Sequence, residues 1–428
     1  MDNQTVKKLW NSFTLGKGNI TFQTTDKYVF RIGETETPVL LSDCEFSLKV
    51  DDKGICVIGK NYGGLMRGFF ALLLKIEYED DSITIKHTED TGKYLIKNRM
   101  IHICVFPEND LCFIKKLVRL SALCQYTHIV IEFWGMLKYA CLKELSWPHA
   151  FTKDEVKEVI RECRQLGIEP IPMFNQLGHA SGSRLCSGKH VVLDQNPVLQ
   201  NLFTPDGWAW NIKSVRTAEL LKQVRLELYD LFGECEYMHI GCDEAYYITQ
   251  DSELHSHLLA YIKNLTSEVE KEGRRPMMWM DMLLEEKRFE NCYATGRTEE
   301  VSALRDAAAK STVFVDWQYD CMDSPVPSLE SLKSCGHDCI GAPWFENYTA
   351  HINTVLQNEM FGIMLTTWHT LKDKMHGIYD CAVRCGAKDF VWGKSSNSLE
   401  KTATLLRRVS FEGNGYESCG WLKRQIEV

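Results

Sequence analysis

The 428-residue sequence lacks a cationic stripe, a long apolar run and a strong metal-binding motif. Its 58 acidic and 49 basic residues are scattered and give a formal net charge of −9, so we expect no nucleic-acid partner. No stretch approaches the ~20 apolar residues of a membrane helix, and residues 1–13 lack the apolar core of a secretory signal. We therefore expect a soluble, cytoplasmic protein without a membrane partner.

The 17 cysteines follow neither a disulfide framework nor a zinc-finger pattern. Their number is odd, and they are scattered through strand-like and helix-like segments alike. The nearest approach to a metal motif is Cys335-Gly-His-Asp-Cys339, which has no second Cys/His pair at suitable spacing. We therefore expect reduced, buried thiols, no metal and no other cofactor.

The pattern of the sequence changes near residue 93. Before it, short strand candidates such as FSLKV and GICVIG flank a glycine-marked helix, GGLMRGFFALLLKI. We predict a small α+β N-terminal domain at residues 1–92, a barrel at 93–375, and a helical C-terminal extension packed on the barrel at 376–428.

Eight apolar strand candidates, separated by amphipathic helices, follow residue 93. They span residues 99–105, 127–133, 168–174, 237–241, 276–280, 312–317, 339–344 and 362–368. The capping box Thr152-Lys-Asp-Glu155 opens one helix, and another runs from Ser214 to Gly233. Because eight is the number of strands in a closed (β/α)₈ barrel, the predicted fold class is α/β, with a TIM barrel after the small domain.

Chemically active residues gather where these candidate strands end, which is where such barrels carry their active sites. Asp243 and Glu244 stand side by side after the fourth strand. Five of the eleven tryptophans also end strands: Trp134, Trp279, Trp317, Trp344 and Trp368. Tryptophan rings pack against the apolar faces of sugars, so the pattern favours a carbohydrate ligand. Taken alone, an Asp-Glu pair more often stabilises a helix N-terminus.

Several segments resemble glycoside hydrolase family 20, the β-N-acetylhexosaminidases. His239-Ile-Gly-Cys-Asp-Glu244 is similar to the family's H-x-G-G-D-E motif, with Cys242 at the second glycine. Residues 151–179 resemble the segment that leads to strand three and its Pro-Gly-His, residues 99–105 the first strand, and residues 46–76 the small domain. Asn175 stands where many members carry aspartate, which is expected of a divergent branch similar to hexosaminidase D-like enzymes.

The resemblance implies a retaining exo-β-N-acetylhexosaminidase that hydrolyses terminal β-linked GlcNAc or GalNAc. Glu244 matches the general acid/base, and Asp243 matches the carboxylate that orients the 2-acetamido group. In substrate-assisted catalysis the acetamido oxygen attacks the anomeric carbon to form an oxazolinium ion, whose charge a nearby anion stabilises. An ionised Asp243 also favours the protonated form of Glu244. Alternation along a strand is expected to aim the two carboxylates at different parts of the sugar.

The resemblance also implies a set of substrate-binding side chains. These are Arg99 at the ring hydroxyls, His179 and His239 holding the acid, Trp279, Trp317 and Trp368 around the acetamido methyl, and Tyr319 at its oxygen. Trp344 is a further candidate, for which barrel closure is an equally good interpretation. The expected partner is an N-acetylhexosamine-terminated glycan or glycoconjugate, and a homodimer is left open.

Two strand ends depart from the family pattern, and two other functions stay open. Trp344-Phe-Glu346 stands for Tyr-Leu-Asp and Trp368-His-Thr370 for Trp-Gly-Glu, so recognition of the 4- and 6-hydroxyl edge is expected to differ. One alternative is a metal-dependent barrel hydrolase; its ligands are His102, His179, His239 and Asp243, which form no tight ligand motif. The other is a sugar-binding barrel that has lost catalysis.

Overall fold

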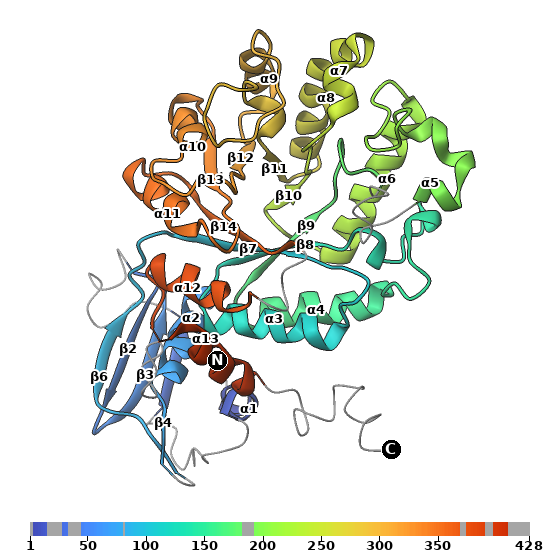
Figure 1. The fold of residues 1–428 in the computed structure, drawn as a ribbon. Coiled ribbons are helices and arrows are strands. Elements are labelled where there is room, and N and C mark those ends of the chain that lie inside the picture. Colours follow the sequence, from blue (N-terminus) through green and yellow to red (C-terminus); the bar gives the residue numbers. More distant parts are fainter. Residues whose placement is uncertain are drawn as a thin grey trace.

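A computed structural model describes residues 3–14, 28–32, 44–79, 82–181, 192–368, 374–389 and 397–409. Eight parallel strands close into a barrel in the order β10-β11-β12-β13-β14-β7-β8-β9 (Figure 1). They are β7 (Asn98–Cys104), β8 (His128–Glu132), β9 (Glu169–Met173), β10 (Tyr237–His239), β11 (Arg275–Trp279), β12 (Val313–Asp316), β13 (Asp338–Gly341) and β14 (Gly362–Thr366). The predicted α/β fold class and (β/α)₈ barrel are confirmed, and each predicted strand coincides with an observed one.

Helices alternate with these strands and cover the barrel. They are α3 (Leu111–Leu123), α4 (Lys153–Gln165), α5 (Val192–Gln195), α6 (Val215–Phe232), α7 (Tyr246–Gln250), α8 (Ser252–Lys271), α9 (Val301–Ala307), α10 (Pro327–Ser331) and α11 (Tyr348–Gln357). Helix α4 begins with the predicted capping box, in which Thr152 and Glu155 each accept the other's backbone N–H. Its apolar residues, including Val156 and Val159, are buried, so one face of α4 holds it against the barrel.

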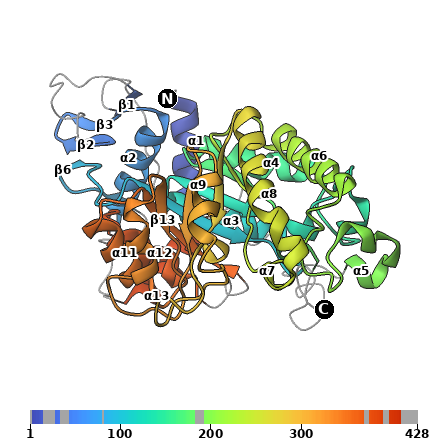
Figure 2. The same cartoon turned by 90° about the horizontal axis from the view of Figure 1, so that it is seen from above.

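The N-terminal part is a small mixed sheet covered by a helix. Strands β1 (Tyr28–Ile32), β3 (Gly54–Gly59), β2 (Phe46–Asp51) and β6 (Thr88–Thr91) pair in that order; β1–β3 is parallel, and β3–β2 and β2–β6 are antiparallel. Helix α2 (Tyr62–Leu74) contacts β2, β3 and the barrel helix α3. Strands β4 (Glu77–Glu79) and β5 (Ser82–Thr84) form a hairpin. The small sheet and the barrel therefore share α2 as a packing layer, on one side of the barrel (Figures 1 and 2).

Three further helices lie near this junction. Helix α1 (Asn3–Thr14), which the sequence patterns did not predict, contacts α13 (Ser398–Arg408), and α13 in turn contacts α3 and α12 (His376–Arg384). The exact boundaries of the three predicted parts, residues 1–92, 93–375 and 376–428, stay a prediction. No helix in the described ranges is both long and apolar enough to cross a bilayer.

Candidate active site

Asp243 and Glu244 lie in the loop between β10 and α7, at the carboxyl ends of the barrel strands. Because β10 ends at His239, strand alternation does not set their directions, and that part of the sequence interpretation is wrong. The backbone turns instead through left-handed conformations, with φ of +65° at Gly241, +74° at Cys242 and +51° at Glu244. The turn brings both carboxylates to one partner.

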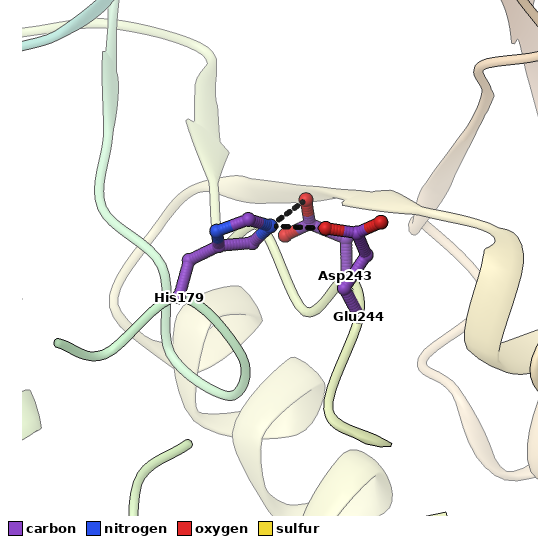
Figure 3. A group of neighbouring side chains, drawn as sticks. All are labelled: His179, Asp243 and Glu244. Carbon is purple, nitrogen blue, oxygen red and sulfur yellow. Dashed lines mark ion pairs between the residues drawn. The ribbon is translucent and has the colours of Figure 1, made fainter. Parts of the chain in front are cut away.

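That partner is His179, whose ring lies against both carboxylates (Figure 3). Its Nε2 is 3.2 Å from Asp243 Oδ2 and 2.8 Å from Glu244 Oε2. The Asp243 side chain is 5% exposed and the Glu244 side chain 22% exposed. The two adjacent acids therefore differ in depth: Asp243 lies at the bottom of the site, and Glu244 stands nearer to solvent.

A third carboxylate, Asp281, holds the backbone beneath the acid pair. Its Oδ2 accepts the Glu244 backbone N–H at 2.8 Å, and its Oδ1 accepts the Trp317 indole N–H at 3.3 Å. Burial, followed by the charge of Asp243, raises the pKa of Asp281 well above its usual range. From the sequence, Asp281 is one of the strand-end candidates, beside Trp279, but no role in the site was assigned to it.

Gly178 allows the two loops to meet, and Cys242 adopts a left-handed conformation in the acid loop. A Cβ on Gly178 would lie 1.8 Å from the Asp243 carbonyl oxygen, so the chain before His179 touches the acid loop through a glycine. Cys242 occupies a left-handed conformation that costs an L-residue roughly 1–2 kcal/mol, and its side chain is fully buried. This conformation accounts for the glycine that the resembling motif carries at the position of Cys242.

Four of the predicted aromatic residues form a connected, half-buried group beside the acids. The Trp368 indole N–H donates to the Tyr319 hydroxyl at 2.7 Å. The Tyr319 ring lies 5.2 Å from that of Trp317 and 5.6 Å from that of Trp344. Burial raises the pKa of Tyr319, and the charges of the two acids add to this shift, so its hydroxyl keeps its proton near Asp243 and Glu244.

Sequence reasoning missed two aromatic side chains that contact Glu244. The Trp208 indole N–H donates to the Glu244 carbonyl at 2.6 Å, and the Trp208 ring lies 4.5 Å from that of His179. The Tyr246 hydroxyl is hydrogen-bonded to the Glu244 side chain and accepts the Tyr293 hydroxyl at 2.8 Å. Trp208 belongs to the irregular segment before α6, so no strand-end pattern could have selected it.

Two predicted substrate-binding residues, His239 and Trp279, lie beneath the site rather than in it. Both are 0% exposed, and their rings are 4.4 Å apart. The His239 Nδ1 accepts the Gly241 N–H at 3.1 Å, and burial lowers the pKa of His239 to about 3. The prediction that His239 holds the acid is corrected accordingly: a neutral histidine supports the turn before the acid loop. Trp279 likewise has no surface open to a ligand.

The prediction for Arg99 is wrong. Arg99 lies near the start of β7, at the end of the barrel opposite the carboxylates, and is 0% exposed. Its guanidinium donates to the carbonyls of Gln125, Ile96 and Lys97 at 3.1, 2.7 and 2.9 Å. Glu45 of the small domain lies 3.5 Å away. Arg99 therefore links the barrel to the small domain and does not contact a sugar at the carboxyl-end face.

The four ligands of the metal-dependent alternative do not converge. Only His179 and Asp243 of that set come together; with Glu244 they form the group of three candidate ligands found among the described residues. His102 is buried and its Nε2 lies 3.1 Å from Glu132. Asn175 donates to the same Glu132 carboxylate at 3.3 Å.

The structure describes only some of the residues at the two strand ends that depart from the family pattern. Trp344 is half-buried, and Glu346 is exposed and forms an ion pair with Lys374. Thr370 lies outside the described residues. The carboxylate of Glu346 is therefore engaged by a lysine from the segment after β14.

A (β/α)₈ barrel with carboxylates, an imidazole and tryptophans at its strand ends has the architecture of a barrel hydrolase. Residues 134–373, more than half of the chain, match the model of the glycosyl hydrolase family 20 catalytic domain. The chain belongs to glycosyl hydrolase family 20 and is a glycoside hydrolase.

Solved structures of the same family share the fold. The exo-β-N-acetylglucosaminidase of Vibrio harveyi, solved with N-acetylglucosamine, is 14% identical over 95% of this chain and 73% of its own, with a TM-score of 0.67. The β-N-acetylhexosaminidase of Streptomyces coelicolor A3(2) is 13% identical over 97% of this chain and 90% of its own, with a TM-score of 0.66. A chitobiase of Flavobacterium johnsoniae is 13% identical over 95% and 67%, with a TM-score of 0.69.

Proposed function

We propose that the protein is a retaining exo-β-N-acetylhexosaminidase that hydrolyses terminal β-linked GlcNAc or GalNAc by substrate-assisted catalysis. One observation carries the proposal: two adjacent carboxylates share His179 but lie at different depths. Such a pair can divide the work between a buried anion that binds the acetamido group and a more exposed acid that meets the leaving oxygen.

Asp243 suits the acetamido group because part of its carboxylate is uncommitted. Asp243 is 3% exposed, and its Oδ1 has no hydrogen-bond partner among the described residues. A buried oxygen of this kind can accept the acetamido N–H. As the acetamido oxygen attacks the anomeric carbon, positive charge develops on the oxazolinium ring, and the fixed anion stabilises it in a weakly screened setting.

Glu244 suits the role of general acid because its backbone and its side chain are both fixed. Asp281 binds its N–H and Trp208 binds its carbonyl, while His179 contacts its carboxylate. In the first step Glu244 gives its proton to the glycosidic oxygen. In the second step it accepts a proton from the water that opens the oxazolinium ion, so the configuration at the anomeric carbon is retained.

Tyr319 suits the acetamido oxygen. The Trp368 indole N–H can only donate, so the Tyr319 hydroxyl accepts that bond, and its own proton can go to Thr366 Oγ1, 3.2 Å away, or to a substrate oxygen. Trp317, Trp344 and Trp368 are half-buried around it and retain surface for the acetamido methyl and one sugar face. The proposed partner is therefore an N-acetylhexosamine-terminated glycan or glycoconjugate.

Cytoplasmic location is part of the proposal. Ten of the fifteen cysteines in the described segments are buried, which suits a reducing compartment.

Substitution of each acid tests the proposal. We expect Glu244→Gln to lower kcat on an aryl β-GlcNAc by about 10²–10⁴-fold, because proton donation is lost. Asp243→Asn should lower kcat by about 10²–10³-fold, because the neutral amide does not stabilise the developing charge. The exposed Glu330→Gln is the control and should leave kcat unchanged. Wild-type kcat in either acid variant would overturn the assignment.

Two measurements separate the alternatives. Hydrolysis that persists after dialysis against a chelator excludes a metal-dependent hydrolase. The second measurement compares binding with turnover. If the protein binds N-acetylhexosamine but hydrolyses neither aryl β-GlcNAc nor aryl β-GalNAc, it is a sugar-binding barrel that has lost catalysis.

A further inference from the structure

Three donor atoms of different residues converge at the carboxyl-end face of the barrel (Figure 3). The Nε2 of His179 and one carboxylate oxygen each from Asp243 and Glu244 all lie within 4.8 Å of one another. One imidazole nitrogen with two carboxylate oxygens is a ligand set that suits first-row transition ions, and three protein ligands plus water are common in open zinc sites.

The spacing of the donors is close to that of a zinc site. Two ligands of a tetrahedral Zn²⁺ ion at about 2.1 Å lie roughly 3.4 Å apart. The His179 nitrogen is 3.2 Å from the Asp243 oxygen and 2.8 Å from the Glu244 oxygen. A small outward movement of the Glu244 side chain, which is 22% exposed, would bring its distance to the His179 nitrogen to that of a zinc site.

The donors are also fixed before any ion arrives. His179 and Glu244 have φ of +52° and +51°, and Asp281 holds the Glu244 backbone N–H at 2.8 Å. Preorganised ligands lower the entropic cost of binding. A cation placed between Asp243 and Glu244 would also relieve the repulsion between these two adjacent carboxylates.

We propose that this cluster binds one Zn²⁺ ion reversibly and that the bound ion inhibits hydrolysis. The metal takes the same Glu244 oxygen that must carry the proton for the leaving group, and it occupies the Asp243 oxygen beside the acetamido position. Binding itself does not depend on the proposed function; inhibition does. Mg²⁺ prefers six oxygen ligands and keeps its waters, so it should not compete at this site.

A second place on the chain could also take zinc. The Sγ atoms of Cys335 and Cys339 are 3.6 Å apart, and thiolates are strong zinc ligands. These cysteines flank the start of β13, at the opposite end of the barrel strands from Glu244. The double variant Cys335→Ser/Cys339→Ser is therefore the matched control, because it removes that candidate without touching the acids.

Calorimetric titration of the full chain with ZnCl₂ and steady-state kinetics test the proposal together. We expect one site per chain and inhibition that is competitive with an aryl β-GlcNAc. EDTA should reverse the inhibition, and MgCl₂ should not cause it. The cysteine double variant should bind and respond as the wild type does.

Variants of the ligands give the deciding comparison. His179→Ala should weaken Zn²⁺ binding at least about tenfold. Glu244→Gln should also weaken it, because glutamine keeps the shape of the glutamate side chain but loses its charge. Unchanged affinity in both variants, or loss of binding in the cysteine variant, would overturn the proposal, as would no binding to the wild type. Wild-type zinc binding without any hydrolysis would instead overturn the proposed function.

Discussion

At the scale of single residues, the site is a set of three carboxylates in three environments. Glu244 is partly exposed, Asp243 is buried against His179, and Asp281 is buried beneath both of them. Only Asp281 lies below the acid loop, where it binds the Glu244 N–H. We infer that Asp281 is a positioning residue for the acid.

Asp281→Asn tests this placement through pH. The folded protein holds the pKa of Asp281 above the unfolded value of about 3.9. The stability that comes from this group is thus present below about pH 4 and is lost as pH rises toward the folded pKa. Asparagine does not titrate. Between pH 4 and pH 8 the melting temperature of the wild type should therefore fall relative to that of Asp281→Asn. A difference independent of pH would contradict the placement.

Some residue roles could be predicted from the sequence, and others could not. That Asp243, Glu244 and His179 lie together could be predicted because their motifs are local; their roles stay a proposal. Trp208 and Tyr246 were missed because their contacts to Glu244 arise from tertiary packing. The left-handed conformation of Cys242 shows why a glycine is usual there, which no sequence without a backbone could show.

At the scale of elements, the site depends on contact between two loops. The segment after β9 carries His179, and the segment after β10 carries the acids; the two meet where Gly178 lies against the Asp243 carbonyl. Strand alternation predicted the wrong geometry because the fourth strand ends at His239, four residues before Asp243. Loop turns, which periodicity does not specify, set the directions of the carboxylates.

Gly178→Ala tests the loop contact. The new Cβ would lie 1.8 Å from the Asp243 carbonyl oxygen, so the acid loop must shift. Because a displacement of about 1 Å can cost about 10²-fold in rate, we expect kcat/KM to fall by that order. Gly273→Ala is the control: its φ is +81° but nothing lies within 4 Å, so it should cost some stability and no activity. Full activity in Gly178→Ala would contradict the contact.

At the scale of the whole molecule, one acidic residue joins the small domain to the barrel. Glu45 pairs with Arg67 of α2 and lies 3.5 Å from Arg99 of β7. Arg67 and Arg99 are 8% and 0% exposed. The order of strands and helices predicted both parts of the fold, but not this junction, because an arginine at the start of a strand looks the same in sequence whether it meets a sugar or a neighbouring domain.

Glu45→Gln tests the junction. The substitution leaves two buried guanidinium groups without their anion, which should cost about 2–4 kcal/mol, near the low end for buried pairs because Glu45 is 24% exposed. Thermal unfolding should therefore begin at a lower temperature, while kcat of the folded enzyme stays the same. The surface ion pair of Lys115 and Glu158 gives the control, Glu158→Gln, which should leave the unfolding temperature almost unchanged. A large loss of kcat in Glu45→Gln would contradict the separation of junction and site.

The central claim is that the substrate's own acetamido group acts as the nucleophile. The most direct measurement compares kcat/KM for aryl β-GlcNAc and β-GalNAc with that for the matching aryl sugars that carry a 2-hydroxyl group. The geometry of Asp243, Glu244 and Tyr319 predicts hydrolysis of the acetamido sugars alone. Equal rates on the 2-hydroxyl sugars would contradict substrate-assisted catalysis.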